Sequence, residues 1–296
     1  MEIDMLLPQE NIASHPLNSA AQETGIRVVR LNPKGKERHT RSEPHRHDYY
    51  EIIFLEKGSG VHIVDFEQLE IHNNVCYLLA PESVHHFDTL REVNMQGWLV
   101  EISKDYMHAI DSSLNVLFCK NRGKMALTIP TEEIARLSNL LAHMKEEQDS
   151  NRKMSAQAVV SYFRLVMVEL YRLLEQQQQA EHFTEPDERF LAFMEWVEVL
   201  HREVKSITVY ADKVHLSPRQ LNRICLDITG KTANQLLNER VSLEAKRLLF
   251  NGQIQAKEVG YHLGFDDPSN FVKFFKRHNG ISPAGFRESM SKINHR

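Results

Sequence analysis

A repeat with an offset of fifty residues is the feature that most constrains this 296-residue chain. Segment 217–225 aligns with segment 267–275, and Gly230 aligns with Gly280. Each copy opens with a residue that can cap a helix, followed by a proline, which suits the first helical position because no N–H is needed there. The repeat therefore predicts two short helices with equivalent beginnings and ends.

Each predicted helix has one apolar side and one side rich in hydrogen-bond donors. Arg and Lys can donate to the edge of guanine, and Asn or Gln can pair with adenine. The apolar positions are Leu221, Ile224, Cys225 and Ile228 in the first copy, and Phe271, Phe274 and Phe275 in the second. The polar positions are Arg219, Asn222 and Arg223 in the first copy, and Ser269, Asn270 and Lys273 in the second.

A further short helix is predicted upstream of each copy, at 208–214 and 256–263. A tight connection joins each of them to the repeat helix that follows it. Two short helices joined in this way form a helix-turn-helix unit. A helix over 232–250 would separate the two units by about 28 Å at 1.5 Å per residue. Both donor-rich helices could then enter successive major grooves of one duplex, which lie roughly 34 Å apart.

The charge distribution agrees with a polyanionic partner for this part of the chain. Residues 205–296 carry a net charge of +7, whereas the preceding residues carry −11. Clustered basic residues favour association with nucleic acid. The sequence thus predicts double-stranded DNA as the partner of the C-terminal part.

The C-terminal segment resembles the AraC/XylS family of bacterial transcription regulators. The resemblance covers about ninety residues and rests on AKEVGYHLGFDDPSNF (256–271), KFFKR (273–277) and GISPAGFR (280–287). Two positions depart from the family pattern: Gly260 stands where alanine is common, and Cys225 where a larger apolar residue is usual. The resemblance implies base contacts and phosphate contacts, the latter positioning the protein without reading sequence. The implied base contacts are Arg219, Asn222, Arg223, Ser269 and Lys273, with Gln220 and Asn270 close by, and the implied phosphate contacts are Lys231, Lys276 and Arg277.

The N-terminal half has the pattern of a small β-barrel or sandwich. Residues 57–60 are interpreted as a hairpin connection. The predicted strands are 26–31, 49–55, 61–66, 75–79 and 96–102. Two amphipathic helices are predicted at 131–147 and 155–174. The predicted fold class is α+β, with a sensor and dimerisation domain at 1–175 (barrel about 25–105, helices about 131–175), a linker at 176–187, and an all-α DNA-binding domain at 188–296.

A group of histidines in the predicted barrel resembles the first cupin motif. His45, His47 and Glu51 have the motif spacing, with Gly58 seven residues after the glutamate, and LAPESVHH (79–86) resembles a degraded second motif. In metal-binding cupins such residues hold a divalent ion, and the ligands here would be His45, His47, Glu51 and His86. His85 would replace His86 if the strand register shifts, because neighbouring strand residues face opposite sides. The favoured interpretation is a metal-free sensor without cofactor, in which these residues border an effector pocket.

Other sequence features narrow the class of protein. The scattered Cys76, Cys119 and Cys225 do not suggest a disulfide framework, and no stretch is long and apolar enough for a membrane helix. We therefore expect a cytoplasmic, non-enzymatic regulator that does not associate with membranes. By resemblance it is a homodimer, with Tyr162, Phe163, Val166 and Leu170 near the interface; the alternative is that the apolar stripes of the two helices pack on the barrel. The resemblance also implies an activator that contacts RNA polymerase and responds to a small molecule.

Two other functions remain open from the sequence. A cupin metalloenzyme carrying a DNA-binding tail would bind metal and turn over a substrate. A nucleoid-type binder would hold any duplex with similar affinity, although paired Asn and Arg faces are unusual for pure phosphate binding.

Overall fold

The computed structural model describes residues 13–15, 17, 24–32, 43–88, 93–109, 117–118, 126–150, 152–178, 188–250 and 254–294. The chain forms two compact units, one within residues 13–183 and the other within residues 184–296. The first contains all the described strands, and the second is entirely helical where it is described.

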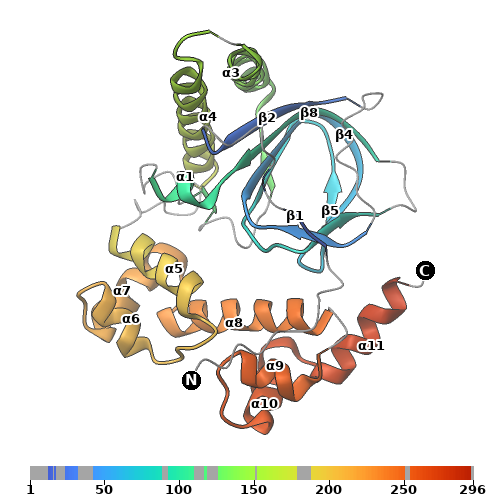
Figure 1. The fold of residues 1–296 in the computed structure, drawn as a ribbon. Helices are drawn as coiled ribbons and strands as arrows, with labels where there is room; N and C mark the ends of the chain where they lie inside the picture. The colour runs from blue at the N-terminus through green and yellow to red at the C-terminus, as the bar shows by residue number, and fades with distance from the viewer. Residues whose placement is uncertain are drawn as a thin grey trace. The chain divides into compact units, whose positions relative to one another are not determined.

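The N-terminal unit is a strand-rich, cupin-like barrel (Figure 1). Strands β2 and β6 have the predicted bounds, and β8 begins two residues before its predicted start. Its strands are β1 (Ala13–His15), β2 (Ile26–Leu31), β3 (His45–His47), β4 (Tyr50–Val64), β5 (Glu67–Ile71), β6 (Val75–Leu79), β7 (His85–Phe87), β8 (Asn94–Ile102) and β9 (Ala126–Thr128).

The long strand β4 contradicts the predicted hairpin at residues 57–60. Lys57 and Gly58 remain paired with β8, after a bulge between Leu55 and Lys57. The chain turns later, at Asp65 and Phe66, whose φ angles of 46° and 75° are left-handed. Gly58 serves close packing instead, because a Cβ there would lie 2.7 Å from Ile71 Cγ2.

Strand β4 joins both sides of the barrel. Its first half pairs with β6 and β8, and its second half pairs with β5 and β7. Ile53 and Leu55 lie in one core cluster with residues of β2, β5, β7 and β8, which fills the barrel. Ile52 and Phe54 point to the opposite side and pack against α3 (Thr131–Asp149) and α4 (Ser155–Gln178). The strand is therefore buried on both faces.

The apolar stripe of α4 packs within its own chain. Phe163, Val166 and Leu170 are at most 1% exposed and belong to the core cluster beneath the helices. The expectation that they lie near a dimer interface is therefore wrong, while Tyr162 is only partly buried. Helix α4 also continues to Gln178, so the first residues of the predicted linker are helical and residues 179–187 lie outside the described part.

The C-terminal unit contains two short helix pairs arranged around one longer helix (Figure 1). Helix α8 follows the first pair, α6 and α7, and precedes the second pair, α9 and α10. Together with α1 (Lys104–Ala109) of the barrel unit, the remaining helices are α5 (Glu188–Leu200), α6 (Ile207–Lys213), α7 (Pro218–Thr229), α8 (Ala233–Phe250), α9 (Ala256–His262), α10 (Pro268–Asn279) and α11 (Pro283–Asn294). None of the helices in the described part of the chain has both the length and the apolar composition needed to cross a bilayer.

Candidate functional site

The predicted ends of α7 and α10 are confirmed. The Ser217 hydroxyl accepts a hydrogen bond from the Gln220 backbone N–H, and the Gln220 side chain accepts one from the Ser217 N–H in return. At α10 the Asp267 carboxylate accepts from the Ser269 N–H at 2.6 Å, which lowers the pKa of Asp267. Gly230 and Gly280 end the two helices in the left-handed conformation. Both helices are therefore fixed at each end by local interactions.

The turns that precede α7 and α10 differ in length by one residue. Helices α6 and α9 are offset by forty-nine residues, whereas α7 and α10 are offset by fifty. The left-handed position of the first turn is His215, with φ of 55°, and that of the second is Gly264, with φ of 75°. The extra residue thus lies between Gly264 and the cap at Asp267.

Helix α7 presents Arg219, Gln220 and Arg223 to solvent. The Arg223 side chain is 84% exposed, and its Nε lies 3.8 Å from an Asp227 carboxylate oxygen. Asn222 differs from the predicted arrangement, because it is half-buried and its Oδ1 accepts a hydrogen bond of 3.0 Å from the Ala233 N–H. Asn222 therefore caps the start of α8.

Helix α10 presents its predicted polar residues to solvent as well. Ser269, Asn270 and Lys273 are exposed on its first turns, followed by Lys276 and Arg277. Such lysine and arginine side chains, free to extend, suit contacts to phosphate. Lys231, which follows α7, is also exposed, and its Nζ pairs with Glu239 at 2.9 Å.

The small residue at position 260 matches the large side chain beside it. A Cβ on Gly260 would lie 3.0 Å from the Cβ of Phe271, which is fully buried in α10. The equivalent positions in the first unit are Ala211 and Leu221, both fully buried. The departure of Gly260 from the family pattern therefore permits the close approach of α9 and α10.

A buried network of ion pairs, centred on Glu244, connects α8 to the segment after α5. The carboxylate of Glu244, on α8, binds Arg202 at 2.6 Å and Arg240 at 2.9 Å, and His201 lies 3.8 Å away. Arg240 also pairs with Glu198 of α5 at 2.8 Å. Burial alone would raise the pKa of Glu244, but His201 and three guanidinium groups, including that of Arg247, hold it well below its usual value.

The same segment supports the second turn. A Cβ on Gly264 would lie 2.5 Å from the Arg202 carbonyl oxygen, so this glycine rests directly on the backbone after α5. Lys205 donates from Nζ to the carbonyls of His201 and Arg202 and lies over the Phe265 ring. Burial lowers the pKa of Lys205 to about 8. The Tyr210 hydroxyl of α6 donates to the Val204 carbonyl, so residues 201–205 contact both helix-turn-helix units.

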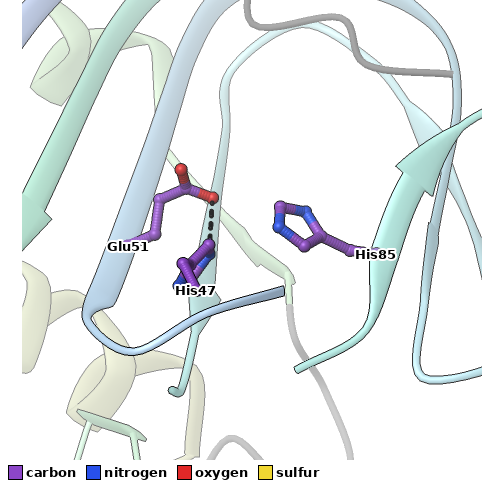
Figure 2. A group of neighbouring side chains, drawn as sticks. All are labelled: His47, Glu51 and His85. Carbon is purple, nitrogen blue, oxygen red and sulfur yellow. Dashed lines mark ion pairs between the residues drawn. The ribbon is translucent and has the colours of Figure 1, made fainter. Parts of the chain in front are cut away.

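The barrel brings His47, Glu51 and His85 together (Figure 2). They come from the end of β3, the start of β4 and the start of β7. Figure 2 shows the three side chains converging, with the His47 imidazole next to the Glu51 carboxylate. The separation of His47 Nε2 and Glu51 Oε2 is 3.5 Å, and the side chains are at most 1% exposed. Two imidazoles and a carboxylate are a ligand set for a transition metal.

The predicted ligand His86 is not part of this group, and its neighbour His85 takes the place. Side chains alternate along β7, so His85 faces the other histidines while the half-buried His86 faces away. His45 lies beside the group, with its ring 4.2 Å from that of His85. His62 belongs to no motif and was not predicted, yet its Nε2 is 3.0 Å from His85 Nδ1. Its position follows from the pairing of β4 with β7, which only the register reveals.

Two family models match the chain. Residues 34–174 match the AraC-like ligand binding domain, and residues 210–289 match a helix-turn-helix domain. Among curated relatives, the HTH-type transcriptional activator RhaS of Salmonella paratyphi A is 23% identical over 255 residues, covering 84% of this chain and 88% of the relative. RhaS of Escherichia fergusonii is also 23% identical, over 271 residues, covering 90% of this chain and 94% of the relative.

Solved structures of similar proteins include one that spans both units. ToxT from Vibrio cholerae is 15% identical and covers 88% of this chain and 97% of its own, with a TM-score of 0.42. The DNA-binding domain of AdpA, solved in complex with a target DNA, is 28% identical and covers 34% of this chain and 91% of its own, with a TM-score of 0.32.

Proposed function

The chain belongs to the AraC/XylS family of transcription regulators, and from this premise we propose that it binds double-stranded DNA through α7 and α10 and activates transcription in response to a ligand. One observation carries the proposal: two equivalently capped helices, each with an exposed donor-rich side, lie before and after α8. At 1.5 Å per residue, the 18 residues of α8 extend over about 27 Å. That length is comparable to one turn of the duplex.

The exposed side chains have separate roles in this proposal. Arg219 and Arg223 of α7 read base edges, assisted by Gln220, and Ser269, Asn270 and Lys273 do the same from α10. Lys231, Lys276 and Arg277 contact phosphates and set the position of the protein. Asn222 supports the site by capping α8 and has no base contact in this proposal.

A selection from random duplexes, followed by affinity measurements, tests the proposal. The double variant Arg219→Ala/Arg223→Ala should bind the selected duplex far more weakly and lose most of its preference over random DNA. Arg152→Ala is a matched control, because that arginine is 65% exposed in the barrel unit. If the double variant retains the full preference, α7 does not read the sequence.

The match to a ligand-binding domain supports a small-molecule effector held by the barrel unit. We propose that the effector changes how a homodimer presents its DNA-binding units, and that the bound dimer contacts RNA polymerase. Such coupling requires the effector to bind two arrangements with unequal affinity. Light scattering with and without DNA tests the dimer. If removing residues 1–180 leaves the promoter response to every inducing condition unchanged, the coupling is excluded.

A further inference from the structure

We propose that His47, Glu51 and His85 bind one divalent transition-metal ion inside the barrel. This goes beyond the DNA-binding function and does not depend on it. One ligand atom from each of the three residues lies within 4.8 Å of the others. Because the residues come from β3, β4 and β7, the fold of the barrel, not one local turn, brings them together.

The barrel holds the ring of His47 in an orientation suited to a metal. Its Nδ1 lies 2.7 Å from the Tyr49 carbonyl oxygen, to which a neutral imidazole donates from Nδ1. That tautomer leaves the Nε2 lone pair directed toward Glu51. Metal-binding histidines characteristically donate their other N–H to a carbonyl or carboxylate in this way.

His62 supplies the equivalent contact for His85. The His62 Nε2 and His85 Nδ1 atoms are 3.0 Å apart, so one of the two rings donates to the other. When His85 donates from Nδ1, its Nε2 is available to bind a metal. His62 is fully buried and stacks on Phe87, with ring centroids 4.4 Å apart, which fixes its own orientation.

The charges of the group also favour a cation. Glu51 is fully buried, and a buried carboxylate is costly unless opposite charge offsets it. A divalent ion held between this carboxylate and the two imidazoles would supply such a charge.

The ligand set defines the class of metal. Two imidazoles and one carboxylate suit Zn²⁺, Fe²⁺, Mn²⁺, Co²⁺ or Ni²⁺, whereas Mg²⁺ and Ca²⁺ prefer sites made of oxygen ligands. Three protein ligands leave at least one coordination position for water or another molecule. An effector with oxygen donors could occupy that position.

Titration of the tag-free full-length chain with Co²⁺, after chelator treatment, tests the site. We expect visible absorption bands that saturate at about one equivalent, and elemental analysis of the Zn²⁺-loaded chain should give the same stoichiometry. Glu51→Gln and His85→Asn should each weaken Co²⁺ binding at least about tenfold. His86→Asn is the matched control, because it changes the neighbouring histidine on the other face of β7 and should leave the affinity unchanged.

Thermal unfolding provides a second readout. Metal should raise the Tm of the wild-type chain and of His86→Asn, because a ligand that binds only the folded state stabilises it. If the two ligand variants do not fold, His62→Gln should still fold and bind Co²⁺ roughly 10–100-fold more weakly. The proposal is overturned if the wild-type chain binds no stoichiometric metal of this class, or if His86→Asn loses as much affinity as His85→Asn.

Discussion

The two helix-turn-helix units share their caps but differ in how they begin the helix that follows. Ala233 and Pro283 occupy equivalent first positions of α8 and α11. Ala233 has an N–H, and Asn222 accepts from it. Pro283 has none, and the position equivalent to Asn222 is occupied by Val272. The polar residue thus stands where the backbone N–H needs an acceptor, and an apolar residue stands where proline has no N–H.

The units also differ in the size of their interior side chains. The second is built on aromatic rings: the Phe275 ring centroid lies 6.0 Å from that of Phe271 and 5.8 Å from that of Phe286. The equivalent of Phe275 in the first unit is Cys225, which is also fully buried. We therefore expect these two equivalent positions to contribute unequally to stability.

The largest difference in unfolding free energy between the two units is expected when Phe275 and its equivalent, Cys225, are each changed to alanine. Phe275→Ala should lower the free energy of unfolding by about 3–5 kcal/mol, because it removes a buried ring and leaves a cavity. Cys225→Ala should cost much less, because only the sulfur is lost. Urea unfolding of the full chain carrying Trp98→Phe, so that Trp196 is the remaining tryptophan, measures both by fluorescence. Equal losses would show that the two interiors are energetically alike.

The residue assigned to a base, Arg223 of α7, and the residue assigned to a phosphate, Lys276 of α10, should differ in their effect on sequence discrimination. Arg223→Ala should cost about 1–3 kcal/mol at one base pair and relax specificity there, because a bidentate contact is lost. Lys276→Ala should weaken binding to all duplexes alike and reduce the salt dependence by about one unit of slope. Affinities for a set of singly substituted duplexes at several salt concentrations distinguish the two. Uniform loss for Arg223→Ala would mean that this residue only contacts phosphate.

The two turns should respond to substitution with opposite sign. Gly264→Ala should destabilise the chain by about 1–3 kcal/mol, because the residue has a left-handed φ and its Cβ would meet the Arg202 carbonyl. His215→Gly should stabilise it by up to about 1 kcal/mol, because His215 already adopts a conformation that glycine enters freely. Thermal unfolding of both variants gives the sign directly. A stabilised Gly264→Ala would exclude the close contact.

The smallest effect concerns the start of α8. Asn222→Ala should lower the free energy of unfolding by about 1 kcal/mol, because the Ala233 N–H loses its acceptor. Val272→Ala, at the equivalent half-exposed position of α10, should change stability by no more than about 0.5 kcal/mol. Should Asn222→Ala prove neutral in unfolding but lose a base preference, the side chain reads DNA instead of capping.

The sequence predicted features that local interactions determine. The caps at Ser217 and Asp267 and the glycines that end both helices depend on residues close in the chain, and all were placed correctly. The role of Asn222 depends on a contact eleven residues away, at the start of another helix. Periodicity identified its polar side of the helix but not the partner it meets there.

In the barrel, the wrong predictions came from sequence patterns that fit more than one structure. Gly58 and Gly60 suggested a turn, but glycine also permits strands to pack closely, and β4 continues through both. The choice between His85 and His86 depended on register, which the pairing of β7 with β4 sets. The apolar stripe of α4 was visible in the sequence, although what covers it was not, and it packs on the barrel.

The position of Gly264 on the carbonyls that follow α5 has a consequence for operator architecture. The backbone after α5 contacts the second turn directly, and Glu244 holds that backbone to the middle of α8. The spacing between the two reading helices is therefore fixed within one DNA-binding unit. One base pair added between the two half-sites would rotate the second by about 35° around the duplex axis. Because these contacts hold the two helices at one spacing, we expect the operator to keep a constant number of base pairs between the two sites that α7 and α10 read.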